Sequence, residues 1–424
     1  MAAPVESAGT VDRPLGEVAP RPARFGALAN PLYLRYWIGS LSSVSGTQLV
    51  MLGQGWVIVD KLGGSALSLG IVGAATAVPT ILVNLFGGVL ADRLDRRLLL
   101  ITTALIQVVL FALMAVLDAT GTLRVWHVTA IAAGLGLVYG VDWPSRNAFF
   151  PLLIGREQMM SAVALNAMVW QGTRIVAPAI GGVLIAITGT PIVFALSAVG
   201  ALGMWAILLT LRIPATTSNA TRDVVRELRE GLDFIFQRRI FLALLGLTYA
   251  SMFFGMQYVQ LMPLMAKEFD VESGRLGLLF TAVGAGAVCG TFVTLRLQKS
   301  ERLGMMILTA VLVAALFVVG FAASPSYIIG VGLLFMAALA NSVFSISIMT
   351  ALQLRVPDHL RGRVMGIHTI TFSLIPLGGL LGGAIAEVTN VRIALAVSAI
   401  ALALIVVAVG ATQREVRDLD GRPA

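Results

Sequence analysis

The sequence predicts an all-α membrane protein with twelve transmembrane helices in two pseudo-symmetric six-helix bundles. Its 424 residues are 58% hydrophobic and only 12% charged, whereas soluble chains carry roughly 25% charged residues. The apolar runs are about 20 residues long, which is the length of a helix that crosses about 30 Å of hydrocarbon. They lack the two-residue alternation of barrel strands. Because a backbone inside lipid must be hydrogen-bonded internally, such runs are expected to be helices.

Twelve candidate spans follow one another along the chain, separated by short polar segments. We place them near 35–59, 66–91, 98–117, 125–150, 161–187, 192–211, 240–265, 275–296, 304–322, 327–350, 364–387 and 391–411. The expected organisation is a disordered N-terminal tail over 1–34, a first bundle over 35–211, a linker over 212–239, a second bundle over 240–411 and a C-terminal tail over 412–424.

The basic residues indicate how the chain is oriented. If the N-terminus is cytoplasmic, the inner loops and tails hold 24 of the 30 Lys and Arg residues, and Arg174 lies inside a span. The five in outer loops are Lys61, Arg124, Lys267, Arg275 and Arg392. Such a bias is the positive-inside signal. We therefore expect a multi-pass protein of a bacterial inner membrane with both termini in the cytoplasm.

The linker 212–239 carries an amphipathic pattern. The apolar residues recur at helical spacing, at Val224, Leu228, Leu232 and Ile235. Charged residues occupy the other faces. This pattern predicts a helix that lies on the inner membrane surface. A plain linker is the alternative.

The two halves of the chain are related by a nearly constant offset. Gly181 and Gly182 precede Gly382 and Gly383 by 201 positions, and other motif positions repeat with an offset of 201 or 202. Two six-helix halves that arise from a repeat are typical of transporters, whose substrate site lies at the interface between the halves near the bilayer midplane.

Several other classes of function are excluded by what the chain contains. The single cysteine, Cys289, lies in an apolar run, so it forms no intrachain disulfide or thiolate metal cluster. There is no G-x4-G-K-[ST] loop for ATP. We expect no catalytic residue, no metal and no cofactor. The net charge of +8 is spread over short loops between spans, which argues against a nucleic-acid partner.

The loop between spans two and three carries a recognisable motif. It reads Gly88-x3-Asp92-Arg93-x-Asp95-Arg96-Arg97. This resembles the loop signature G-x3-D-R-x-G-R-[RK] of the major facilitator superfamily, and Asp95 in place of the usual glycine resembles the drug-efflux branch that contains the enterobactin exporter. The resemblance covers essentially the whole chain and implies the superfamily fold.

The resemblance also implies that this loop is part of a gate. Gly88 removes a side chain where helices must approach closely. Asp92, at the inner end of span two, would accept hydrogen bonds from the start of span eleven near Arg363 to Gly366, where the helix dipole favours a carboxylate. Arg93, Arg96 and Arg97 would bind acids or helix ends nearby.

Span five resembles a second motif of the superfamily. Ala177-Pro178-x2-Gly181-Gly182 is similar to the end of the antiporter motif G-P-x2-G, with Ala177 in place of its glycine. The resemblance implies an exporter that exchanges a drug for protons. Pro178 removes a backbone donor and bends the helix, and the two glycines permit close packing. An ordinary proline kink is the alternative.

Arg174 lies about halfway along span five. An arginine at that depth costs roughly 2.5–3.5 kcal/mol on insertion scales, so it normally faces a polar cavity or a partner. We expect Asp142 on span four to be that partner. Asp142 also has Arg146 four residues further on, a spacing that suits an intrahelical pair. In one interpretation Arg174 and Asp142 line the cavity and one of them senses a proton or the substrate. In the other they form a structural bridge between spans four and five. Arg146 is a further candidate for the cavity.

Other polar residues inside spans are candidates for substrate contact or coupling. Gln257 and Gln260 lie in span seven, which lines the cavity in the superfamily that the chain resembles. His368, in span eleven, has a side chain that titrates near neutral pH. Each of the three could instead bond across helices in a purely structural role.

The function predicted from these observations is secondary active transport. We expect proton-coupled export of a small apolar or amphiphilic molecule, such as a drug, siderophore or metabolite, by a monomer in the lipid bilayer. An importer or uniporter of a small metabolite on the same fold is the main alternative. A membrane sensor without transport activity is a third.

Overall fold

The computed structural model describes residues 26–93, 95–211, 224–297 and 302–420, with side chains described outside 85–93 and 224–228. These residues are helical apart from short connections, and no strand occurs among them. The predicted all-α fold is therefore confirmed. Most of the tail expected over 1–34, much of the linker over 212–239 and the last residues of the C-terminal tail lie outside the described residues.

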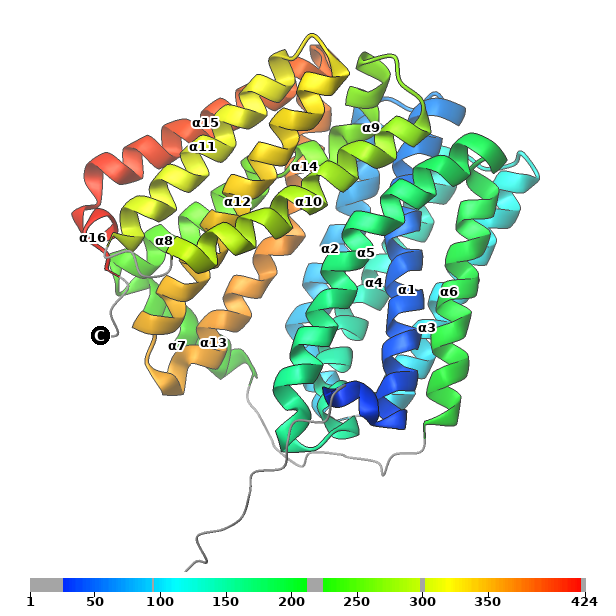
Figure 1. The fold of residues 1–424 in the computed structure, drawn as a ribbon, viewed down its shortest axis with the longest axis horizontal. Coiled ribbons are helices and arrows are strands. Elements are labelled where there is room, and N and C mark those ends of the chain that lie inside the picture. Colours follow the sequence, from blue (N-terminus) through cyan, green and yellow to red (C-terminus); the bar gives the residue numbers. More distant parts are fainter. Residues whose placement is uncertain (1–25, 94, 212–223, 298–301, 421–424) are drawn as a thin grey trace, which may run out of the picture.

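The helices form two bundles that stand side by side (Figure 1). The N-terminal bundle consists of α1 (Pro31–Trp56), α2 (Ala66–Arg93), α3 (Arg96–Ala119), α4 (Val125–Phe149), α5 (Met159–Thr188) and α6 (Thr190–Thr210). The C-terminal bundle consists of α8 (Arg239–Ala250), α9 (Tyr258–Glu268), α10 (Ser273–Leu297), α11 (Leu303–Ala323), α12 (Tyr327–Arg355), α13 (Asp358–Thr369), α14 (Leu374–Val388) and α15 (Val391–Thr412). Two short helices, α7 (Val224–Phe236) and α16 (Arg414–Arg417), lie outside the spans.

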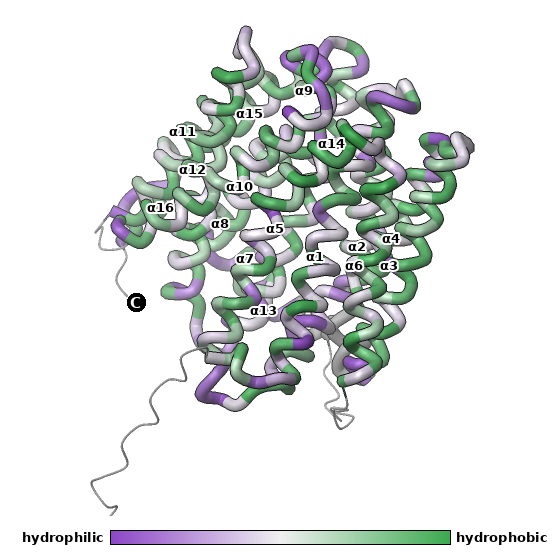
Figure 2. The backbone as a smooth tube through the Cα atoms, turned by 45° about the vertical axis from the view of Figure 1, so that its right-hand side comes forward, coloured by the Kyte–Doolittle hydropathy of each residue, from purple (hydrophilic) through white to green (hydrophobic). Residues whose placement is uncertain are grey.

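The helices have the length and composition of membrane spans. Eleven of the described segments are long and apolar enough to cross a bilayer. Helix α1, which packs against α5 and α6, is not among them and completes the set of twelve. Figure 2 shows hydrophobic residues along the middle of the helices and hydrophilic residues at both ends. The chain is thus a multi-pass membrane protein.

Two spans of the C-terminal bundle are discontinuous. Span seven consists of α8, a widened helical turn at Ser251–Gly255 and α9, and span eleven consists of α13, a tightened turn at Ile370–Ser373 and α14. Backbone irregularity at membrane depth is tolerated where it is buried in protein or lines a cavity. In transporters such breaks commonly frame the binding site.

The molecule has two ends, the terminal face and the distal face. The terminal face is the end where α1 begins, α6 ends and α8 begins, and the distal face is the opposite end, where α9 ends and α10 begins. In Figure 1 the terminal face lies at the bottom, and the two bundles approach each other toward the distal face at the top.

The interface between the bundles is built from two equivalent helix pairs, α5 with α10 and α2 with α14. A Cβ added to Gly182 would lie 2.5 Å from the carbonyl oxygen of Ser273, and one added to Gly383 would lie 2.5 Å from that of Ala66. Gly182 and Gly383 are the repeat-related glycines of the sequence. The absence of a side chain at both positions lets the backbones of the two bundles touch.

This close approach is confined to the distal part of the helices. On α5, a Cβ added to Gly172, about three turns nearer the terminal face than Gly182, would meet no atom within 4 Å. In span eleven the same is true of Gly362 and Gly366, whereas Gly383 is tightly packed. The bundles are therefore in contact at the distal face and separated further toward the terminal face.

Candidate functional site

A central cavity of about 160 Å³ lies between the two bundles. Its walls come from α1, α2 and α4 on one side and from α9, α10 and α14 on the other, and most of them are apolar. Its polar lining residues are Thr47, Gln54, Thr76, Tyr139 and Gln260. Drug-sized ligands occupy pockets of roughly 300–1,000 Å³, so this cavity in its present state is too small to enclose such a molecule.

Gln260 joins the two bundles at this cavity. Its Nε2 donates a hydrogen bond of 3.1 Å to the carbonyl oxygen of Leu69 on α2. Gln260 stands in the first turn of α9, just after the irregular part of span seven, and Pro376 of α14 lines the same cavity just after the irregular part of span eleven. The two broken spans therefore frame the central cavity.

Gln257 and His368 do not share this position. Gln257 is buried inside the C-terminal bundle, where its Nε2 donates a 3.3 Å hydrogen bond to the carbonyl oxygen of Ala394. His368 is buried near the end of α13, and its Nε2 has no hydrogen-bond partner among the described residues. Of the candidate residues in spans seven and eleven, only Gln260 borders the central cavity.

A buried ion pair lies inside the N-terminal bundle. The Nε of Arg146 lies 2.5 Å from the Oδ2 of Asp142, as the spacing of four residues predicts. The hydroxyl of Thr103 on α3 donates a 2.8 Å hydrogen bond to Asp142, and Arg146 donates a 3.1 Å hydrogen bond to Ser43 on α1. The Nη1 atom of Arg146 is buried without a described partner. The cluster thus ties α4 to both α1 and α3.

The structure corrects the expected partner of Arg174. Asp142 is engaged by Arg146 and Thr103 and not by Arg174. Arg174 is half-buried on α5 and makes no hydrogen bond or ion pair with any residue that the structure describes. Tyr258, which belongs to α9 of the other bundle, lies within electrostatic range of Arg174. The prediction failed because the intrahelical pair on α4 satisfies Asp142 locally.

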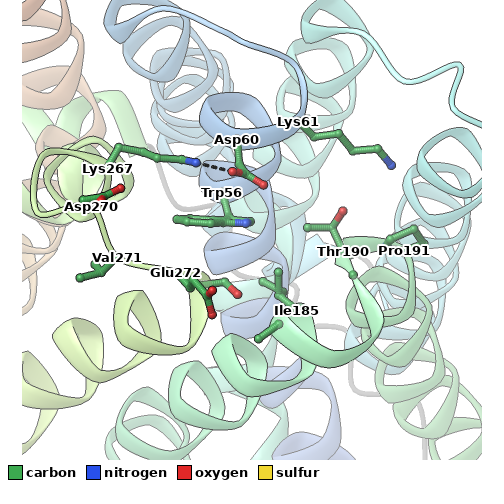
Figure 3. A pocket seen from close by; sticks show the side chains of 13 residues that line it. Trp56, Asp60, Lys61, Ile185, Thr190, Pro191, Lys267, Asp270, Val271 and Glu272 are labelled. Carbon is green, nitrogen blue, oxygen red and sulfur yellow. Dashed lines mark hydrogen bonds and ion pairs between the residues drawn. The ribbon is translucent and has the colours of Figure 1, made fainter.

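Charged contacts close the interface at the distal face (Figure 3). The ammonium group of Lys267, at the end of α9, forms an ion pair with Asp60 of the N-terminal bundle and lies 4.9 Å from the ring centroid of Trp56. Both charged side chains are more than 40% exposed, so the pair contributes little stability by itself. These residues border a pocket of about 740 Å³ that opens at the distal face.

A carboxylate caps a helix across the same interface. The Oε2 of Glu387, at the end of α14, accepts a 3.0 Å hydrogen bond from the backbone N–H of Leu67 in the first turn of α2. A negative charge at a helix N-terminus satisfies free backbone donors and is favoured by the helix dipole. Sequence reasoning did not single out Glu387, although an acid inside the predicted span eleven is the signal that could have found it.

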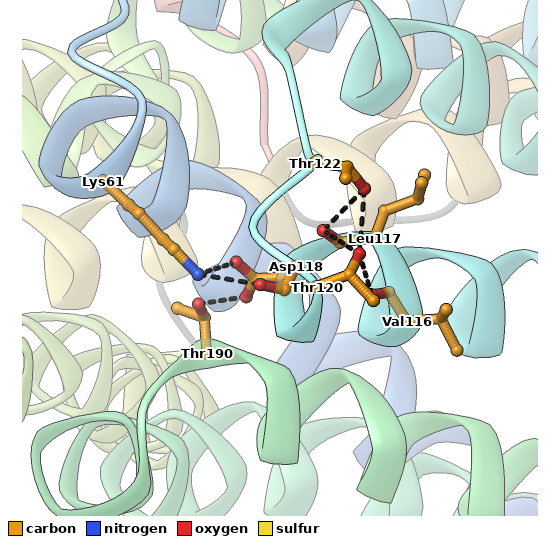
Figure 4. A network of polar contacts seen from close by, with 7 residues as sticks. All are labelled: Lys61, Val116, Leu117, Asp118, Thr120, Thr122 and Thr190. Atoms are coloured by element: carbon orange, nitrogen blue, oxygen red, sulfur yellow. Dashed lines mark hydrogen bonds and ion pairs between the residues drawn. The ribbon is translucent and has the colours of Figure 1, made fainter.

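Asp118 organises the distal end of the N-terminal bundle (Figure 4). Its buried carboxylate forms an ion pair with Lys61 and accepts a hydrogen bond from the hydroxyl of Thr190 at the start of α6. The backbone oxygen of Asp118 accepts a second hydrogen bond, of 3.0 Å, from Lys61. Sequence reasoning missed this residue because the predicted third span ended one residue before it.

The loop signature is partly described. Gly88, Asp92 and Arg93 lie in the last turns of α2, but their side chains are outside the described residues, so the Asp92 latch stays a prediction. Asp95 caps α3 by accepting hydrogen bonds from the backbone N–H groups of Arg97, at 2.8 Å, and Leu98. This role explains why an aspartate can stand where the superfamily pattern has a glycine.

The described arginines of the loop bind neighbouring helix ends. Arg97 donates hydrogen bonds of 3.0 Å to the carbonyl oxygens of Leu208 and Leu209, in the last turn of α6, where a cation is favoured. Arg96 donates a longer one, of 3.4 Å, to Ala148 of α4. Together they hold the terminal ends of α3, α4 and α6 in place.

The expected partner region of Asp92 is engaged with the segment between the bundles. Arg363 of α13 forms an ion pair with Glu230 of α7. A Cβ added to Gly231 of α7 would lie 3.2 Å from the Cβ of Arg363, which shows that the two helices touch. Span eleven therefore begins against the helix that follows the N-terminal bundle.

Comparison with known proteins agrees with this architecture. The family model described as "Transmembrane secretion effector" (MFS_3) matches residues 23–422. The chain is 29% identical over 315 residues to "Enterobactin exporter EntS" of Escherichia coli O1:K1, which covers 72% of this chain and 74% of that protein.

Two solved structures share the fold. The nucleoside transporter NupG has a TM-score of 0.71 at 14% identity and covers 90% of this chain and 99% of its own. The second is an inward-facing, occupied form of a bacterial homologue of the human lysosomal transporter Spinster. It has a TM-score of 0.70 at 15% identity, and the match covers 94% of this chain and 99% of that protein. Since the family model spans nearly the whole chain, this protein belongs to the transmembrane secretion effector family of the major facilitator superfamily and is a membrane transporter.

Proposed function

We propose that this transporter exports a small amphiphilic molecule from the cytoplasm in exchange for protons, as a monomer in a bacterial inner membrane. The main support is the one-sided contact between the bundles, which closes the distal face and leaves the terminal face separated. The bias of basic residues supports a cytoplasmic terminal face. On this assignment the present state is open to the inside, which is where an exporter loads its cargo.

The cross-bundle polar contacts support a rocking mechanism. Among described side chains, every hydrogen bond or ion pair between the bundles lies between the distal face and the level of Ile175, whose carbonyl oxygen accepts a 2.9 Å hydrogen bond from Thr281. The opposite state must break these contacts and form others at the terminal face. The Asp92 latch is our proposal for one of those, since Asp92 lies at the terminal end of α2.

The central cavity is the proposed midpoint of the route. It is lined by both bundles and framed by both broken spans, and its apolar walls with a few polar groups suit an amphiphilic cargo. Its small volume fits a state in which the distal route is shut. Movement of the bundles would enlarge the space when cargo enters from the terminal face.

We assign proton coupling to Asp142. It is the one acid that the structure describes in the middle of a span, away from helix ends. Arg146 bonds both Asp142 and Ser43 of α1, so protonation of Asp142 would remove the counter-charge of Arg146 and change how α1 and α4 pack. One proton entering across 100 mV supplies about 2.3 kcal/mol, and each pH unit adds about 1.4 kcal/mol, so one or two protons suffice for concentrative export.

Reconstituted protein tests this proposal. Proteoliposomes with an imposed pH gradient should move at least one member of a panel of amphiphilic dyes (cationic, neutral and anionic), and an uncoupler should abolish the movement. Protein-free liposomes are the control for leakage. The double variant Asp142→Asn/Arg146→Gln, which leaves no uncompensated charge, should lose the dependence on the pH gradient if Asp142 carries the proton. Absence of gradient-dependent movement for every dye in the panel would remove the export proposal. Movement down the dye gradient that ignores the uncoupler would instead favour a uniporter.

A further inference from the structure

We propose that Arg174 is the binding group for an anionic part of the cargo, so that the transported molecule is an amphiphile bearing a carboxylate, phosphate or phenolate. This inference rests on the proposed function, because it names the class of molecule that the same route carries. It starts from the finding that Arg174 has no acidic partner among the residues that the structure describes.

The position of Arg174 on α5 aims it toward the route between the bundles. Arg174 shares a helix face with Pro178, four residues on, and Gly181, seven residues on. Gly181 packs against Leu49 of α1, and the carbonyl oxygen of Pro178 packs against Gly277 of α10. Arg174 therefore stands on the terminal side of the point where α1, α5 and α10 meet.

The surroundings of Arg174 agree with this placement. Tyr258, which belongs to the opposite bundle, lies within electrostatic range of Arg174. The tyrosine hydroxyl is directed to the sulfur of Met256 at 3.5 Å and is not bonded to Arg174. The backbone of Arg174 belongs to the contact between the bundles, since a Cβ added to Gly284 of α10 would lie 3.3 Å from the carbonyl oxygen of Arg174.

The charge of the membrane interior is unbalanced at this point. On α4, Asp142 and Arg146 neutralise each other as an ion pair, whereas Arg174, halfway along α5, has no ion-pair partner among the described residues. An arginine at this depth is costly unless it faces water or an anion, and guanidinium binds carboxylate and phosphate through two parallel hydrogen bonds. An anionic group of the cargo would supply the missing counter-charge when it binds beside Arg174.

A matched pair of fluorescent probes tests the assignment. Pyrenebutyrate carries an anionic carboxylate, and pyrenebutanol has a similar apolar body without the charge. Binding of each probe to purified protein in phosphatidylcholine nanodiscs is measured by energy transfer from the tryptophans to pyrene. The wild-type protein should bind pyrenebutyrate at least about tenfold more tightly than pyrenebutanol, which is the scale of a hydrogen bond between charged groups.

Substitutions locate the preference. Arg174→Gln should abolish the preference for pyrenebutyrate and leave pyrenebutanol binding unchanged, which also shows that the variant is folded. Arg174→Lys should keep most of the preference, because the positive charge remains. Arg275→Gln, which removes the same charge from the exposed start of α10, is the matched control and should bind both probes like the wild type.

Three outcomes would overturn the assignment. The first is equal binding of the two probes by the wild type, and the second is an unchanged preference in Arg174→Gln. The third is strong competition by phosphatidylglycerol in the nanodiscs that disappears in Arg174→Gln, which would assign Arg174 to a lipid headgroup. If instead the anion preference depends on Arg174 but no gradient drives transport, the binding site stands and the export proposal fails.

Discussion

The two glycines at the distal interface allow a quantitative test of alternating access. Gly182→Ala and Gly383→Ala each place a methyl group 2.5 Å from a carbonyl oxygen of the opposite bundle. Ordinary contact needs at least 3.4 Å, so the facing helices must separate by about 0.9 Å at each site. Neither neighbour can yield by rotating a side chain, because the atoms that clash are backbone.

The expected effect is a shift between the two states rather than unfolding. Overpacking a close contact costs about 1–3 kcal/mol, and the clash exists only while the distal face is closed. A difference of that size changes the ratio of two states by about 5- to 150-fold. The two sites lie on different helix pairs and share no partner, so their effects should add in the double variant.

Spin labels on the distal face measure this shift. In a Cys289→Ser background, Thr120→Cys and Thr389→Cys place one label on each bundle at exposed positions of the distal face. Pulsed electron paramagnetic resonance should show the longer distal distances gaining population in Gly383→Ala, and still more in the double variant. Thermal unfolding of each variant should stay near that of the wild type.

Gly172→Ala is the matched control, because it adds the same methyl group to the same helix α5 where no atom lies within 4 Å. It should leave the distance distribution unchanged. If Gly383→Ala and the double variant give the same distribution as Gly172→Ala, the distal contact is not the one that alternates, and the reasoning fails.

Three further predictions follow from the described contacts. Glu387→Gln removes the charge that caps α2, so it should move the same distal distance distribution toward the open state; an unchanged distribution would show that the cap plays no part in closure. Asp142→Asn leaves Arg146 buried without a counter-charge and should destabilise the protein by about 3–5 kcal/mol, seen as a lower midpoint of thermal unfolding. The double variant Asp142→Asn/Arg146→Gln should recover part of that loss, and no recovery would contradict the pairing. Asp92→Asn should slow transport in proteoliposomes without changing the order of preference among dyes, and a wild-type rate would remove the proposed latch.

Much of the fold could be predicted from the sequence because the signals are local. A run of about 20 apolar residues is sufficient to specify a membrane helix, since the cost of exposing backbone polar groups to lipid leaves no other choice. The intrahelical pair of Asp142 and Arg146 was predictable for the same reason, because residues four apart on a helix are always neighbours. The loop motif identified the superfamily, which the family comparison confirms.

Contacts between helices could not be predicted in this way. The pairing of Arg174 with Asp142 was wrong, because sequence spacing does not say how α4 and α5 are rotated relative to each other. Glu387 and Leu67 are 320 positions apart, and their hydrogen bond exists because α14 ends beside the start of α2. The widened turn in span seven was also invisible in a continuous apolar run.

The sequence alone determined that the chain is a membrane protein, that it crosses the bilayer as helices and that it belongs to a transporter superfamily. Each of these properties is specified by residues that are close together in the sequence. Only the tertiary structure decided which end of the bundle interface is closed, which glycines touch backbone and which arginine lacks a counter-charge. Those features depend on the relative rotation and tilt of helices that are distant in the sequence, and a transporter changes this arrangement as it works.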